Sequence, residues 1–102
     1  MDNYRIRVNQ ANIDHGHIYL REAMSMFPKS VIGGSNKSEM SKQLLSLTYD
    51  GLDAVRTDID GKKLFFRERS AVKEFFKLKN IRANDEVIVT KAGDFEYFVK
   101  KA

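Results

Sequence analysis

The stretch LSLTYDGLDAVRTDIDGKKLFFRER, residues 45–69, decides the fold because two Asp-Gly pairs interrupt it. Before the first pair, apolar residues alternate with polar ones, which is typical of a strand with one buried face. Asp50-Gly51 and Asp60-Gly61 are strong signals for tight turns between strands. We therefore expect two hairpins, with one strand over residues 54–59 and the next over 62–69.

In the expected strand over residues 62–69, basic and mostly apolar residues take opposite sides. One side carries Lys63, Arg67 and Arg69, and the other carries Leu64, Phe66 and Glu68. Downstream, the spacing becomes helical, with Val72, Phe75 and Phe76 on one face. We expect Ser70 as the N-cap of this helix and Asn80 at its end.

The remaining segments give shorter elements. A third hairpin is expected from residues 87–89 and 95–99, joined by Ala92-Gly93-Asp94. From the N-terminus, we expect a short strand or arm over residues 1–16, a strand over 17–21, a helical turn over 23–27, a flexible loop over 29–38, and a helical start near residue 40 that passes into a strand.

This order of elements lacks the strand–helix–strand repeats of a parallel sheet. It predicts a mainly β, α+β fold: a small open antiparallel pseudobarrel with one or two short helices. At 102 residues the chain suits a single domain. We place an N-terminal strand or arm at residues 1–16 and the pseudobarrel domain at 17–102.

Positive charge is concentrated in one window of the chain. Residues 62–82 contain eight Lys or Arg and two acids, whereas the rest of the chain is slightly acidic. Such a patch attracts polyanions, and nucleic acid is the commonest partner of this kind. The alternative is a solvated helix face without a partner.

Composition narrows the class of protein further. The chain has no cysteine, so disulfide and thiolate chemistry are excluded and a reducing compartment is favoured. No apolar run approaches the ~20 residues of a membrane span, and the first twenty residues lack the apolar stretch of a secretory signal. We expect a cytoplasmic protein with no membrane partner, no cofactor and no bound metal.

Four segments match a known arrangement together: residues 17–21 (HIYLR) leading to Phe27-Pro28 and a Gly-rich loop, residues 47–51 (LTYDG), a basic-aromatic strand running into residues 72–76 (VKEFF), and residues 81–87 (IRANDEV). This arrangement resembles the B3-like DNA-binding pseudobarrel domains, especially those attached to bacterial restriction enzymes. Asn84 stands where that family has a glycine, and asparagine tolerates the same left-handed backbone.

The resemblance implies a barrel that holds the major groove of double-stranded DNA between two arms, over residues 29–38 and 60–69. It implies sequence-specific binding in restriction-modification or regulation, by a monomer without catalysis of its own. Any nuclease or methyltransferase would be a fused or associated domain. The expected DNA-binding residues are Lys29, Ser35, Asn36, Lys37, Ser38, Lys62, Lys63, Arg67, Arg69 and Lys73. Lys62, Lys63, Arg67 and Lys73 suit phosphates, and Asn36, Arg67 and Arg69 suit base edges.

Other functions remain open at this point. Asp60-Gly61-Lys62 has the acid-x-Lys spacing of many metal-dependent nucleases, although an Asp-Gly pair is mainly a turn device. His15 and His17 form a pair, but no third metal ligand is evident. A swapped-hairpin antitoxin-type regulator or oligomerisation module would use residues 81–89 as a dimer strand. Exposed phenylalanines would instead indicate a single-strand binder.

Overall fold

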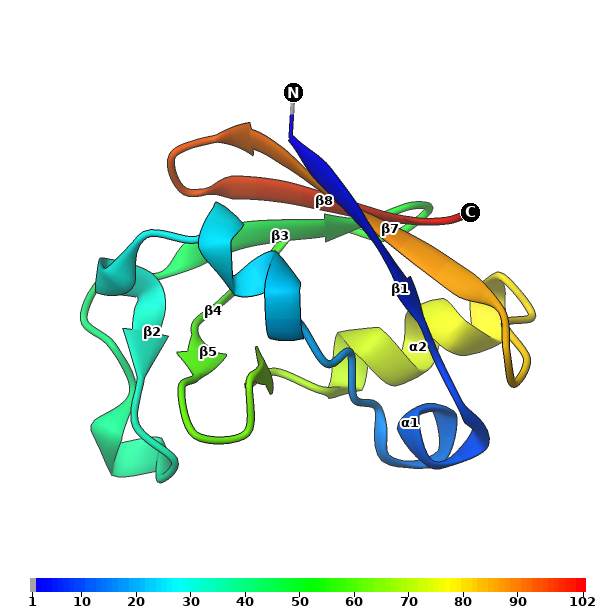
Figure 1. Cartoon of the computed structure of the whole chain (residues 1–102), viewed down its shortest axis with the longest axis horizontal. Helices are drawn as coiled ribbons and strands as arrows, with labels where there is room; N and C mark the ends of the chain where they lie inside the picture. Colours follow the sequence, from blue (N-terminus) through cyan, green and yellow to red (C-terminus); the bar gives the residue numbers. More distant parts are fainter. Residues whose placement is uncertain (1) are drawn as a thin grey trace.

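The computed structural model describes residues 2–102 and is built mostly of strands, with two α-helices (Figure 1). Residue 1 of the expected N-terminal arm lies outside the described part. The elements in chain order are β1 (Asn3–Arg7), α1 (Gln10–His15), β2 (Ile32–Gly33), β3 (Leu45–Tyr49), β4 (Val55–Thr57), β5 (Ile59–Asp60), β6 (Phe65–Phe66), α2 (Ser70–Leu78), β7 (Glu86–Gly93) and β8 (Glu96–Lys101). Short 3₁₀ turns occur at Arg21–Met26, Lys29–Val31 and Lys37–Glu39.

The strands form two mixed sheets. The larger has five strands in the order β1-β7-β8-β3-β4, and the smaller has three in the order β2-β5-β6. All neighbours pair antiparallel except β3 with β8 and β2 with β5. The larger sheet is open, with β1 and β4 at its edges. The predicted mainly β, α+β class with an open, unclosed sheet is confirmed.

The three predicted hairpins are present. β3 pairs with β4 after the Asp50-Gly51 turn, where Gly51 has a φ of 88° that favours glycine. β5 pairs with β6, and β7 with β8. The strand predicted over residues 54–59 is divided, because Asp58 separates β4 of the larger sheet from β5 of the smaller one.

Helix α2 packs its apolar face against the larger sheet. Val72, Phe75 and Phe76 are buried, and the Phe75 ring lies 5.2 Å from the ring of Tyr49 on β3. The predicted N-cap was wrong, since Ser70 is already helical. Arg69 takes the N-cap position without a capping side chain, and Glu68 before it supplies the acceptor, because its Oε1 accepts a hydrogen bond from the Ser70 N–H at 2.7 Å.

The core lies between the inner face of the larger sheet, α2 and the small sheet, as the arrangement in Figure 1 indicates. Its largest fully buried side chains are Tyr49, Tyr97, Phe66, Phe75, Ile18, Leu20, Leu45, Leu47 and Ile59. Asn80 and Asn84 adopt positive φ values of 51° and 77°, so asparagine does take the left-handed backbone at both turns. No helix within residues 2–102 is long and apolar enough to cross a membrane.

Several local predictions were wrong for identifiable reasons. Within the strand or arm predicted over residues 1–16, the residues after β1 form helix α1, because Asn9 and Asn12 cap it reciprocally. Residues 17–21 make only one bridge, between Tyr19 and Phe65, rather than a strand. No helix forms at residues 40–44 before β3.

The long strand predicted over residues 62–69 is reduced to β6. The strand does not start at Lys62, because the N–H groups of Lys62 and Lys63 donate to the Asp60 carboxylate in a turn. Leu64 adopts a φ of 62°, which is incompatible with an extended strand. The expected alternation of basic and apolar residues therefore does not exist as one sheet surface.

Candidate nucleic-acid interface

Basic residues from several parts of the chain surround one groove beside the small sheet. The groove has a volume of about 560 Å³. We call it the basic groove, and its lining residues are Ser35, Lys37, Met40, Arg56, Thr57, Asp60, Lys63, Phe65, Arg67, Glu68, Arg69, Ser70 and Lys73. Lysine and arginine thus outnumber the two acids, Asp60 and Glu68, along its wall.

Many of the residues predicted from the sequence meet at this groove. The predicted residues that line it are Ser35, Lys37, Lys63, Arg67, Arg69 and Lys73. The predicted residues that are exposed but do not line it are Lys29, Asn36, Ser38 and Lys62. Sequence reasoning missed Arg56, because it precedes the charged window and only the pairing of β4 with β3 brings it here. The one sequence signal for Arg56 is that it is a charged residue within the strand expected over residues 54–59.

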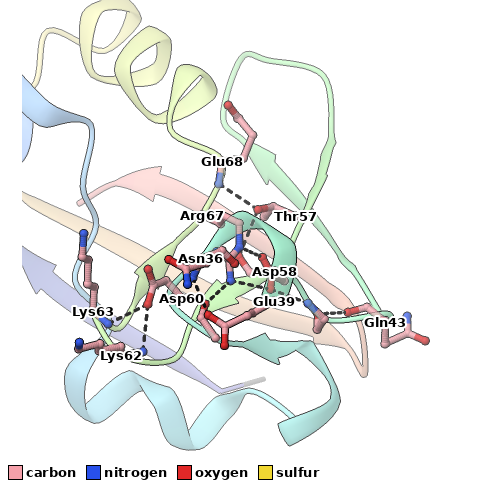
Figure 2. A network of polar contacts seen from close by, with 12 residues as sticks. Asn36, Glu39, Gln43, Thr57, Asp58, Asp60, Lys62, Lys63, Arg67 and Glu68 are labelled. Atoms are coloured by element: carbon pink, nitrogen blue, oxygen red, sulfur yellow. Dashed lines mark hydrogen bonds and ion pairs between the residues drawn. The ribbon is translucent and has the colours of Figure 1, made fainter.

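Both acids of the groove are already bound by backbone groups. The Asp60 Oδ1 atom accepts hydrogen bonds from the N–H groups of Lys62 and Lys63, at 3.0 and 2.9 Å (Figure 2). Glu68 caps α2, with its two carboxylate oxygens accepting from the N–H groups of Ser70 and Ala71. These carboxylates stabilise a turn and a helix start, so they are not paired with the lysines around them.

The cations of the groove, Arg67 aside, have no acidic partner. The ion pairs within residues 2–102 involve Arg5, Arg7, Arg67, Lys79 and Lys101. None of them involves the other basic residues of the groove, which are Lys37, Arg56, Lys63, Arg69 and Lys73. A concave surface lined by like charges focuses its field outward and concentrates anions.

Arg67 has a different position from the one expected. Its side chain is only 14% exposed and forms an ion pair with the fully buried Asp58, with Nε to Oδ1 at 2.5 Å (Figure 2). The hydrogen bond with Asp58 raises the pKa of Arg67 above its ordinary value. The guanidinium also donates to the carbonyl oxygens of Gly34 and Asn36. Four of its five N–H donors are therefore used within the protein, which leaves one Nη1 hydrogen rather than the pair of donors that a bidentate contact to a base edge needs.

The same ion pair holds the loop that forms one wall of the groove. We call residues 34–41 the arm loop. Arg67 binds its first half through Gly34 and Asn36, while Asp58 Oδ2 accepts from the N–H of Ser41 at 2.9 Å. Gly33 precedes the arm loop, and a Cβ there would meet the Asp58 carboxylate. One buried pair thus fixes both ends of the arm loop.

His17 lies where the groove meets the N-terminal segment. Its ring stacks on Phe65 with centroids 4.3 Å apart, and its Nε2 is 3.0 Å from Nη1 of Arg69. Burial lowers the pKa of His17, and the nearby Arg69, His15, Lys63 and Lys73 lower it further. From the sequence, the one chemical role considered for His17 was as half of a metal-binding pair with His15.

The other chemistries receive less support from the local geometry. Asp60 acts as a turn cap, as its hydrogen bonds to the following backbone show. Among residues 2–102, no three His, Asp or Glu side chains are grouped so that they could hold a metal ion. Four phenylalanines that a single-strand binder would need exposed are buried, namely Phe65, Phe66, Phe75 and Phe76. Phe95 and Phe98 are exposed, and they do not line the groove.

Comparison with known proteins adds no assignment: no protein-family model, no curated protein and no solved structure matches this chain. The geometry and charge of the basic groove are therefore the features that bear on function.

Proposed function

We propose that this domain binds double-stranded DNA, with the phosphate backbone lying along the basic groove. The observation that carries the proposal is that Lys37, Arg56, Lys63, Arg69 and Lys73 share one concave surface without an acidic partner in the described chain. Holding like charges together is unfavourable by itself. A bound polyanion neutralises these charges and so offsets their repulsion. The counterions that it releases on binding add to the affinity.

The arrangement favours a duplex over a small anion. The groove is open, and charged, polar and apolar residues all line it. Its lysine and arginine residues are spread over the arm loop, β4, the β5–β6 hairpin and α2. Cations spread over several elements can follow successive phosphates, whereas a single phosphate needs a few convergent donors. Burial of most of the phenylalanines removes the stacking surfaces that single strands require.

Within this proposal the residues have different tasks. Lys63 and Lys73 contact phosphates, because their ammonium groups act as point charges without directional preference. Arg69 is the candidate for base contact, since an exposed guanidinium can bind guanine O6 and N7 with two hydrogen bonds. Arg67 and Asp58 position the arm loop, which carries Ser35, Asn36, Lys37 and Ser38 toward the duplex. Lys29 and Lys62 add charge at the margin.

The B3-like relationship, a role in restriction-modification or regulation, and a cytoplasmic location remain part of this proposal. So does the prediction that the domain has no catalysis of its own and depends on a fused or associated nuclease or methyltransferase. The structure of β7 bears on the swapped-hairpin alternative. Both edges of β7 are paired within the chain, to β1 and to β8, so a dimer through this strand requires strand exchange.

Selection from random duplexes, followed by titration, tests the proposal. We expect the selected duplex to bind more tightly than a single strand or a duplex RNA of the same sequence, with affinity that falls steeply as salt rises. Light scattering with and without the duplex separates a monomeric binder from an exchanged dimer. Equal binding of all three nucleic acids, or no enrichment in the selection, would contradict sequence-specific duplex binding.

A further inference from the structure

Arg69 is exposed but does not project freely into solvent. It lies immediately before α2, and its Nη1 is 3.0 Å from Nε2 of His17. A guanidinium has only donors, so Nε2 must accept this hydrogen bond. The neutral imidazole then carries its proton on Nδ1, which lies 3.3 Å from the Tyr19 hydroxyl and donates to it. The contact therefore assigns both the charge and the tautomer of His17.

Backbone geometry holds the His17 ring at this place. Tyr19 bridges Phe65, and the Leu20 N–H donates to the Leu64 carbonyl at 2.8 Å. Leu64 and Arg21 both have positive φ values, 62° and 43°, which are unfavourable for residues with a side chain. Strained backbone persists only where surrounding contacts enforce it, and it is often found at functional sites. The two residues lie next to a cluster formed by the rings of His17, Tyr19 and Phe65.

The surroundings of His17 keep it neutral. The charged groups that face it are Arg69 and Lys73 at the start of α2, Lys63 on the β5–β6 hairpin, and His15 on α1. No acid contributes to its shift, and the pKa of His17 is lowered by burial first and by these cations second. Protonation would place an imidazolium against a guanidinium and remove the acceptor that Arg69 uses.

We propose that neutral His17 is a positioning residue that holds Arg69 in the basic groove, where Arg69 discriminates between base pairs of the bound duplex. The inference rests on the proposed DNA binding. With one Nη1 hydrogen bonded to His17, the remaining guanidinium donors of the exposed Arg69 make no hydrogen bond within residues 2–102 and can bind a purine edge. A fixed arginine loses less conformational freedom on binding than a mobile one.

Protonation of His17 gives this proposal an unusual signature. An added charge strengthens binding to any duplex, so affinity for a scrambled duplex rises as the pH falls. Release of Arg69 removes discrimination, so the ratio of affinities for the selected and scrambled duplexes falls in the same range. A role limited to charge would raise both affinities together and leave the ratio constant.

The experiment measures that ratio by fluorescence anisotropy over a pH series from ~8 down to ~4, because the pKa of His17 lies below its ordinary value of 6.5. We expect the wild-type ratio to fall on acidification, by roughly 5- to 150-fold if a complete bidentate contact is lost. His17→Gln keeps an acceptor that does not titrate, so its ratio should stay high throughout the series. His17→Ala should have a low ratio throughout.

The chain offers a matched control, because His15 is its other histidine and does not touch Arg69. His15→Gln should keep the wild-type ratio at high pH and still lose it on acidification, at a somewhat higher pH because His15 no longer lowers the pKa of His17. A wild-type ratio that does not change with pH, or a His17→Gln ratio as low as that of His17→Ala, would overturn the proposal.

A measurement without DNA separates this inference from the proposed function. Nitrogen-detected NMR of the histidine rings should show the Nδ1–H tautomer for His17 in the free protein, and Arg69→Ala should raise the pKa of His17. An Nε2–H tautomer would refute the positioning contact even if duplexes bind. The expected tautomer together with a failure to bind any duplex would refute the proposed function and, with it, the discriminating role of Arg69.

Discussion

Replacing Arg67 by methionine should destabilise the domain more than the same replacement at any of its exposed arginines. The substitution leaves the fully buried Asp58 carboxylate without its cation. Methionine still fills the space of the aliphatic part of the arginine side chain. Removing one partner of a buried ion pair costs about 3–5 kcal/mol, because the remaining charge is buried and uncompensated. The Gly34 and Asn36 carbonyls also lose their donor.

The magnitude is large relative to the stability of such a domain, which is about 5–15 kcal/mol. A loss of about 3 kcal/mol should lower the melting temperature by roughly 12–24 °C in a chain of this size. Urea denaturation followed by circular dichroism measures the free energy of unfolding directly. Arg56→Met is the matched control, because Arg56 is exposed and makes no ion pair within residues 2–102, and it should change stability by less than about 0.5 kcal/mol.

A double variant tests the cause of the loss. Asp58→Asn with Arg67→Met removes both charges but keeps an acceptor for the Ser41 N–H. It should be more stable than Arg67→Met alone, because no unpaired charge is buried. A loss below about 1 kcal/mol for Arg67→Met, or a double variant less stable than the single one, would refute the reasoning.

Three further predictions concern the groove and the core. Lys73→Ala should weaken binding to all duplexes and reduce the salt slope by about 1, whereas Lys100→Ala, at an exposed position of β8, should change neither; titrations at several salt concentrations decide. Tyr49→Phe should stabilise the domain by about 1 kcal/mol in urea denaturation, because the buried Tyr49 hydroxyl has no hydrogen-bond partner within residues 2–102; a loss of stability would contradict this. Tyr97→Phe should instead cost about 1–3 kcal/mol, since the Tyr97 hydroxyl donates to the Met26 carbonyl at 2.8 Å. Burial raises the pKa of Tyr97 from 10.0 to about 12. The contribution of Tyr97 to the free energy of unfolding is therefore complete below pH 10.0 and is lost as the pH rises through about 12. An ultraviolet titration that gives an ordinary pKa for Tyr97 would count against this assignment.

Local signals in the sequence predicted the elements whose structure depends on nearby residues. Asp-Gly pairs produced hairpins because the turn geometry is encoded in the turn itself. The helical spacing of Val72, Phe75 and Phe76 produced α2, because one apolar face suffices to place a helix on a sheet.

Long-range contacts decided what the sequence did not reveal. Alternation over residues 62–69 suggested that Arg67 faces solvent, yet Asp58 and the arm loop turn it inward. Nothing near Arg56 in the sequence indicates that β4 lies beside the groove. The contact between His17 and Arg69 joins residues 52 positions apart, so no local pattern could indicate it. The concentration of charge over residues 62–82 indicated several basic residues that line the groove, but tertiary structure determines which of them lack an acidic partner.

The most direct test of the account is the salt dependence of duplex binding by the wild type and by a triple variant, Lys63→Ala, Arg69→Ala and Lys73→Ala. Anisotropy of a labelled selected duplex, measured over a salt series, gives the slope of log affinity against log salt. The account predicts a triple-variant slope that is smaller in magnitude by about 2–3, with a folded protein confirmed by circular dichroism. A folded triple variant with the wild-type affinity and slope would contradict it.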